Sequence, residues 1–311
     1  GMVARGYPRE FAERTFRQLE GFGSYGFPES HAASFAKIAY ASAWMKHHHP
    51  DVFCAALMNA QPMGFYAPSQ IIRDAMDHGV DVRPVDINLS DLENVMERTN
   101  QGGLTLAPRH AEMVEDIWGN MAVRLGFNLV GGLRTDHANL IVAQRRGGFD
   151  SIRDLWLRTR LSPKVLQVLA EADAFQSLGL SRRDAAWAIG GLIGTHGAET
   201  LPLFEAAEAP ARWIEEESGL PPMLPGEEVI HDYRALSISL KGHPMGFLRE
   251  NLRSRRFVTV DELRTLRPGS TVNVSGLVLV RQRPGTANGT IFATLEDETG
   301  VANIIVWPKV F

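Results

Sequence analysis

The sequence has little or nothing of three features that mark common protein classes. It contains one cysteine, Cys54, in 311 residues, which excludes a disulfide framework and a zinc site built from several cysteines. No apolar run is long enough to span a membrane, and no charged-then-apolar signal segment is present. We therefore expect a cytoplasmic location and no membrane partner. Cys54 lies in an apolar helical run and is expected to be a small buried residue.

Catalytic patterns are missing as well. No D-x-D pair of aspartates occurs, whereas polymerase chemistry through two divalent metals needs converging carboxylates. There is also no G-x-S-x-G motif, Walker loop or Cys-His nucleophile arrangement. The run His47-His48-His49 suggests metal binding, but neighbouring residues on a helix point about 100° apart. The three side chains therefore do not converge easily on one ion. An independent metal hydrolase is kept as an alternative, and tight, stoichiometric binding of zinc would support it.

Length and charge set broader limits. A chain of 311 residues suits two or three domains with a substantial core. The net charge of −4 does not by itself indicate nucleic-acid binding, yet local basic clusters determine phosphate affinity. Such clusters most often lie on a solvated surface, so each needs a structural context. They are Arg145-Arg146, Arg182-Arg183, Arg253 with Arg255-Arg256, and Arg281 with Arg283.

Residues 21–62 begin with closely spaced glycines and aromatics and continue into a long helical pattern. Ser30 is placed to cap that helix through its hydroxyl group. Pro50 ends the helix and can start another, because proline lacks the NH that a first turn leaves unpaired. A glycine-containing loop thus brings Ser30 and His31 to a helix N-terminus, where amides and the helix dipole favour anions.

The end of the chain is rich in strand patterns. Residues 272–280 alternate apolar and polar before becoming apolar, and residues 290–297 and 301–307 supply two further strands. A basic, glycine-containing loop at 281–289 separates the first two strands. The acidic run Glu296-Asp297-Glu298 lies where a strand meets a turn, and we expect it to solvate that turn.

Several segments resemble one family. The pattern G-F-G-x-Y-G-F-x-x-S-H-A-A-S-F-A, followed by KHHHP and NAQPMGFY, resembles the end of the fingers domain of bacterial C-family DNA polymerases, and most closely their error-prone branch. HGVDVRPVDIN resembles the segment that closes the fingers. LAEADAFQSLGLSRRDA resembles the tandem helix-hairpin-helix region, and LVLVRQRPGTANG with LEDETGVANIIVWP resembles the OB-fold. The resemblance covers residues 11–311.

This resemblance implies a multidomain fold, mainly α, followed by a β OB-fold barrel that is incomplete because three strands are evident where five are needed. The implied domains are the C-terminal part of the fingers at 3–90, a connector with a short β element at 91–124, tandem helix-hairpin-helix units at 125–190, a linker at 191–255 and a partial OB-fold at 256–311. Residues 104–120 do not match the family pattern.

The resemblance also implies site residues. Ser30 and His31 correspond to fingers residues that face the incoming nucleotide, although a plain cap and a first-turn histidine would look the same. The first hairpin has Gly132 at its first glycine position and Arg134 where a second glycine is usual, so an arginine side chain can replace an amide contact; a packing turn is the alternative. The implied DNA contacts are Gly132, Arg134, Thr135, Arg182, Arg183, Arg281, Arg283, Phe292 and Trp307, with at least one of the two aromatics expected to point inward.

We accordingly interpret the chain as a non-palm fragment of an error-prone DNA polymerase used in damage-induced translesion synthesis. The expected partners are a DNA template-primer and dNTP, with a sliding clamp and damage-response accessory proteins by family analogy. The fragment itself should hold no cofactor and be inactive alone; Mg²⁺ and a D-x-D pair are expected in a palm upstream of Val3. A free-standing DNA-binding scaffold protein without a catalytic role is the alternative.

Overall fold

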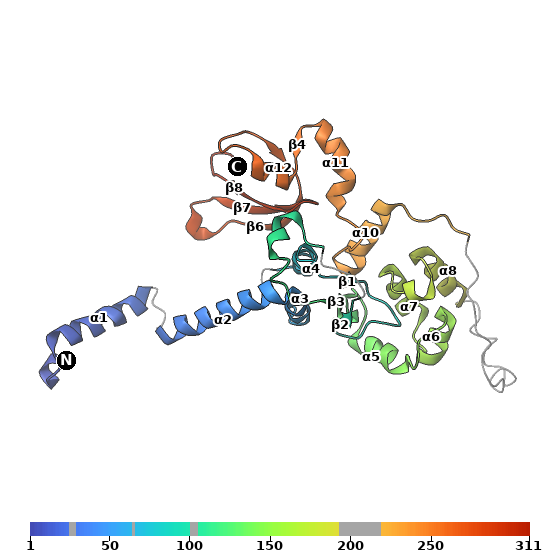
Figure 1. Ribbon diagram of the computed structural model, residues 1–311, viewed down its shortest axis with the longest axis horizontal. Helices are drawn as coiled ribbons and strands as arrows, with labels where there is room; N and C mark the ends of the chain where they lie inside the picture. The colour runs from blue at the N-terminus through green and yellow to red at the C-terminus, as the bar shows by residue number, and fades with distance from the viewer. Residues whose placement is uncertain (25–28, 64–65, 100–104, 193–218) are drawn as a thin grey trace.

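The computed structural model describes residues 1–24, 29–63, 66–99, 105–192 and 219–311. Helices make up most of the first two thirds of the chain, and short sheets dominate the end (Figure 1). The helices are α1 (Arg9–Ser24), α2 (Glu29–His48), α3 (Pro50–Asn59), α4 (Pro68–Asp77), α5 (Thr135–Gln144), α6 (Ile152–Thr159), α7 (Pro163–Glu171), α8 (Arg182–Leu192), α10 (Pro225–Leu236), α11 (Pro244–Ser254) and α12 (Val260–Thr265).

The first two helices form an arm that extends away from the rest of the molecule (Figure 1). Helix α2 begins at Glu29, so the predicted cap residue Ser30 lies within its first turn. The apolar residues Phe35 and Ile38, which recur at helical spacing, are exposed on this arm. Pro50 is the first residue of α3, as the pattern predicted, because a proline at this position costs no hydrogen bond.

Helices α3 and α4 pack against a small sheet of three strands in the order β1-β3-β2. Its strands are β1 (Val82–Arg83), β2 (Val95–Arg98) and β3 (Met121–Arg124). Strand β1 pairs in parallel with β3, and β2 pairs antiparallel with it. Glu97 of β2 accepts hydrogen bonds from Arg83 and Arg124, which brings two arginines to one carboxylate on the sheet.

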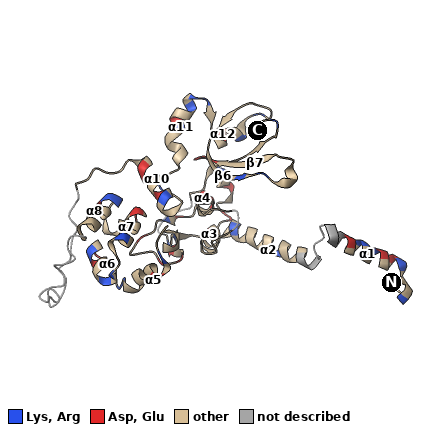
Figure 2. Ribbon diagram, turned by 180° about the vertical axis from the view of Figure 1, so that it is seen from behind, with Lys and Arg blue, Asp and Glu red and all other residues tan. Residues whose placement is uncertain are grey.

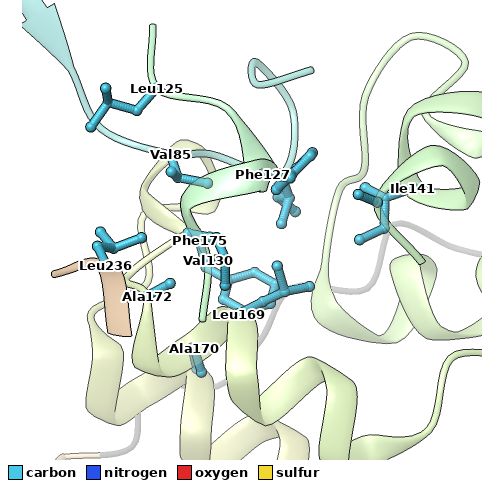
Figure 3. Close-up of a cluster of buried hydrophobic side chains, with 14 of the residues drawn as sticks. Val85, Leu125, Phe127, Val130, Ile141, Leu169, Ala170, Ala172, Phe175 and Leu236 are labelled. Carbon is cyan, nitrogen blue, oxygen red and sulfur yellow. The ribbon is translucent and has the colours of Figure 1, made fainter. Parts of the chain in front are cut away.

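The two hairpins share one apolar core with the sheet region and with α10 (Figure 3). Phe127 and Val130 come from the first hairpin, and Leu169 and Phe175 come from the second. Leu236, at the end of α10, is buried against them although it lies within the predicted linker at 191–255. That linker range contains α10 and α11. The sequence also favours a short helix around Trp213, a residue that falls outside the described ones.

The strand-rich end forms an antiparallel sheet in the order β6-β7-β8 beside a two-stranded β4-β5 pair. The bounds are β4 (Phe257–Val258), β5 (Asn273–Val274), β6 (Leu277–Gln282), β7 (Ile291–Glu296) and β8 (Val301–Val306). The strand predicted at 272–280 is divided into β5 and β6 at Gly276. A Cβ there would lie 2.5 Å from the carbonyl oxygen of Glu296, so this close approach of two backbones requires glycine. Within the described ranges no closed barrel forms, and the predicted fold class of helical units followed by an incomplete β barrel is confirmed.

The turn after β7 is buried, although its acidic sequence predicted a solvated turn. Asp297 has no exposed surface and accepts hydrogen bonds from the amides of Val260, Thr299 and Gly300 at 2.8–3.1 Å. Arg249 of α11 donates to the same carboxylate at 3.1 Å. This carboxylate therefore fixes α11 and α12 to the sheet.

The neighbouring residue Glu296 connects the sheet to α4. Arg73 Nη1 donates to Glu296 Oε1 at 3.1 Å and to the carbonyl of Asp297 at 2.5 Å. His243 Nε2 lies 3.7 Å from Glu296 Oε2, which is an ion-pair distance. Burial raises the pKa of Glu296, but the nearby His243 and Arg73 outweigh it and hold that pKa below its ordinary value.

Across the described residues, each helix is too short or too polar to pass through a bilayer.

Asp297→Asn should destabilise the C-terminal sheet by about 2–4 kcal/mol, because the buried amide NH₂ would face the donors of Val260 and Arg249, and Arg249 would keep only Glu298 as its carboxylate partner. Hydrogen exchange followed by mass spectrometry should show faster exchange in β7 and β8, with α6–α8 unchanged. The control is Asp261→Asn, which removes an exposed ion pair with Arg264 and should cost under about 0.5 kcal/mol. Equal effects of the two substitutions would contradict the role given to Asp297.

Acid should weaken the same region. The pKa values of Glu296, Asp297 and Glu298 are all lowered in the folded chain. The stability that these carboxylates give to the fold is therefore complete above their ordinary pKa values of about 4, and it is lost as the pH falls through the lowered values of the folded chain. When unfolding by urea is measured at a series of pH values from 7 to 3, the urea concentration at the midpoint should therefore decrease once the pH is below about 4. The Asp297→Asn chain should show a flatter decline, and parallel curves would argue against this assignment.

Candidate nucleic-acid interface

The first hairpin presents its predicted contact residues to solvent. Val130 is buried, and the amide of Gly131 donates to the carbonyl of Ala235 in α10 at 2.8 Å, which anchors the base of the turn. Gly132 then adopts φ +84°, a left-handed conformation that favours glycine. Gly132, Arg134 and Thr135 are all exposed at the start of α5. The turn is therefore held from beneath and open above.

The start of α5 has the electrostatics of an anion site, but the carboxylate of Asp136 lies beside it and pairs with Arg134. The first amides of a helix have no carbonyl acceptor within the helix, and the dipole adds partial positive charge there. Arg134 Nε, however, donates to Asp136 Oδ1 at 3.0 Å, and both side chains are more than half exposed. A phosphate bound at this turn would compete with the Asp136 carboxylate for the same guanidinium.

The second hairpin is built differently. Ser181 caps α8, since the amide of Asp184 donates to its hydroxyl at 3.2 Å. Arg182 is not on the surface: its side chain is 5% exposed and contacts Glu228 and Asp232 of α10, each at 2.5 Å, while Nε donates to the carbonyl of Glu171. All three nitrogens have protein acceptors, so Arg182 joins the hairpin to α10 and we do not include it in the interface.

The other arginine of that pair is more accessible. Arg183 donates to the carbonyl of Pro221 at 2.7 Å and lies 3.4 Å from Glu227. Figure 2 shows that basic and acidic positions both occur along α6, α7, α8 and α10. Phosphate contacts on this side would therefore come from single exposed residues.

The sheet carries the aromatic part of the interface. Phe292 of β7 lies directly opposite Ile305 of β8, so both side chains are on the same face. Phe292 and Trp307 are 41% and 61% exposed, and with Ile305 they line a shallow groove beside the 286–288 loop. The expectation that one of the two aromatics points inward is not what the structure shows.

The two predicted arginines of the sheet do not join this groove. Arg281 pairs with Ala293, one residue along from Phe292, and successive residues of a strand point to opposite faces. Arg281 therefore projects from the face opposite to Phe292. Arg283 lies beyond the end of β6, with its guanidinium 5.7 Å from the ring centroid of Phe311.

Ser30 and His31, which were predicted to face the nucleotide, lie at the start of α2, and their side chains fall outside the described residues. The three histidines at the other end of α2 pack with aromatic residues. His48 stacks on Trp118 at a centroid distance of 4.1 Å, and His47 Nε2 lies 3.4 Å from Asp116. Among the residues that the structure describes, no three His, Cys, Asp or Glu side chains are grouped to hold a metal ion.

Residues 105–119, which matched no expected pattern, contribute to the same region. The amides of Trp118 and Gly119 donate to the carbonyl of His48, and Arg109 forms an ion pair with Asp77 at the end of α4. Arg109 also reaches the carbonyl of Thr299 in the turn after β7, at 3.4 Å. The segment thus connects the helices α2–α4 to the sheet, a role that no local sequence signal indicated.

One segment of the chain matches a known protein family. Residues 79–185 match the helix-hairpin-helix motif family, and this range holds the β1-β3-β2 sheet and both hairpins. This part of the chain is therefore similar to helix-hairpin-helix proteins.

Similar proteins that align with the whole chain indicate a narrower family. All of the chain aligns with "Error-prone DNA polymerase 1" of Rhizobium meliloti (strain 1021) at 56% identity, with "Error-prone DNA polymerase" of Mesorhizobium japonicum at 51% and with "Error-prone DNA polymerase" of Brucella abortus biovar 1 at 48%. The chain spans 27–28% of the length of these relatives. Its predicted resemblance to the error-prone branch of the C-family polymerases is confirmed.

Asp136→Asn should strengthen binding of duplex DNA by the 311-residue chain roughly twofold to tenfold at low salt, because it frees Arg134 and removes a negative charge beside the phosphate. Fluorescence anisotropy with a labelled duplex would measure this. Glu13→Gln is the matched control, since it removes the carboxylate of another exposed ion pair, Arg9–Glu13 on the distant arm. Unchanged or weaker binding by Asp136→Asn would argue against a phosphate at this turn.

Proposed function

We propose that this chain is the part of an error-prone DNA polymerase that holds the template-primer during damage-induced translesion synthesis. The observation that carries the proposal is the exposed turn at Gly132, Arg134 and Thr135, within a segment that matches a DNA-binding motif, in a chain whose whole length aligns with error-prone polymerases. A glycine turn followed by a helix start holds a phosphate without reading the base sequence. Such contacts suit an enzyme that moves along any template.

The two halves of the proposed interface have different tasks. The first hairpin would hold backbone phosphates of the duplex, and Arg183 is close enough to the surface to add a peripheral contact. The groove of Phe292, Ile305 and Trp307 would stack the bases of the single-stranded template, because every base offers a ring face to an exposed aromatic side chain. Arg281 and Arg283 would contact phosphates at the sheet edge rather than within this groove.

The remaining partners are proposed by analogy with the C-family polymerases that the sequence resembles. Ser30 and His31 would face the incoming dNTP from the start of α2. The palm of the intact polymerase would supply Mg²⁺ and the catalytic carboxylates; the DNA-holding role proposed for this chain includes no metal step. A sliding clamp, damage-response accessory proteins and a cytoplasmic location complete the proposal for the intact protein.

A free-standing DNA-binding scaffold would share the hairpins and the sheet. The two functions differ in α2, because a scaffold has no use for a nucleotide-facing Ser30 and His31. In the intact polymerase, a change in dNTP affinity or sugar selection on His31→Ala would separate them.

Trp307→Ala should weaken binding of a labelled thymidine oligonucleotide roughly fivefold to 100-fold, because stacking on one aromatic side chain contributes about 1–3 kcal/mol. The matched control is Trp187→Ala on α8, where the tryptophan is 63% exposed and lies far from the groove. Binding by the unmodified chain should also fall steeply as salt is added, because phosphate contacts release counterions. Equal losses for the two tryptophans, or binding that ignores salt, would overturn the proposed function.

A further inference from the structure

A cleft of about 450 Å³ lies between α3, α4 and the C-terminal sheet. Phe53, Leu57 and Ile71 form its helical wall, and Val301 of β8 and Glu296 of β7 form the opposite wall. Figure 1 shows α4 directly beside β6 and β7. A volume of this size lies within the usual range for small ligands.

The cleft and the aromatic groove lie on the same face of the sheet. Side chains at alternate positions of a strand share a face, so Phe292 and Glu296 of β7 project from the same side. Across the sheet, Ile305 pairs with Phe292 and Val301 pairs with Glu296. One face of β7 and β8 therefore passes from the exposed aromatics into the cleft over roughly 13 Å, at about 3.3 Å per residue.

The walls favour a neutral, planar group over a phosphate. Cys54 at the lining is an uncharged thiol, since burial, reinforced by the charges of Asp74 and Asp51, raises its pKa to about 12. Each basic side chain of the lining already has an acidic partner: Lys46 with Asp74, Arg73 with Glu296, Arg109 with Asp77, and Arg264 with Asp261. A phosphate would have to displace one of these carboxylates, whereas an uncharged ring contacts the apolar wall without that cost.

We propose that this cleft accommodates one unpaired base of the single-stranded DNA that follows the sheet face past Trp307 and Phe292. The proposal rests on the proposed function, because the sheet face must bind the strand for a base to reach the cleft. The base inserts between Leu57 of α3 and Val301 of β8, while its phosphates stay outside among the paired charges of the rim. Accommodation requires no sequence preference, since the wall offers apolar contact to any base.

The test uses DNA with a duplex stem and a thymidine tail, in which 2-aminopurine replaces one tail base at a time. The stem fixes the register, and 2-aminopurine emission rises when the base leaves the stack and enters an isolated apolar site. At saturating protein, one tail position should show raised emission. Leu57→Phe and Val301→Phe, which fill the cleft from opposite walls, should abolish that rise and weaken binding roughly fivefold.

Val278→Phe is the matched control. Val278 pairs with Leu295, so it lies on the opposite face of the same sheet, and it is exposed; this variant should keep the emission rise. The two filled variants act through different elements, so one remains informative if the other fails to fold by circular dichroism.

The outcomes separate the inference from the proposed function. Loss of tail binding on Trp307→Ala together with a raised emission that both filled variants abolish would support both. Tight tail binding with no raised position, or a rise that persists in a folded filled variant, would overturn the cleft assignment alone and point to another occupant. Failure of the unmodified chain to bind the tail at all would overturn both.

Discussion

The arrangement of α11, α12 and the C-terminal sheet depends on one carboxylate, Asp297, that has no contact with solvent. Asp297 is acceptable in the interior only because its oxygens receive amide and guanidinium hydrogen bonds from the turn, α11 and α12. An ion held in this way tolerates little displacement, since losing any donor leaves buried charge uncompensated. Adjacent Glu296 extends the constraint to Arg73 of α4. Helix α4 and the C-terminal sheet are therefore held in one geometry by two carboxylates that are adjacent in the sequence.

Local patterns were sufficient to predict many elements. Pro50 and Ser181 mark helix starts through backbone chemistry that needs no tertiary partner, and the alternation at 290–297 and 301–307 gives β7 and β8 closely. Contacts between distant segments could not be predicted. Arg182 has the same sequence surroundings as a surface arginine, and its burial depends on Asp232, fifty residues away.

The candidate interface shows the same division. The exposed turn at Gly132 follows from a glycine in a known motif. The separation of Arg281 from Phe292 depends on the register of β6 and β7, which cannot be read from the sequence. The acidic run at 296–298 carries the local signal of a solvated turn, but its donors come from four separate elements. The cleft beside it could not be predicted, because its two walls meet only in the folded chain.

The burial of Leu236 beneath both hairpins has a consequence for how the chain can vary. The core of the hairpin unit is completed only after the chain has passed through residues 193–218, so the compact unit is discontinuous in sequence. The entropy cost of closing such an excursion grows only with the logarithm of its length. The length of the passage between α8 and α10 therefore carries little weight in the free energy of folding, whereas the spacing from Asp232 to Ser239 is fixed by the hydrogen bond that the Ser239 hydroxyl donates to Asp232.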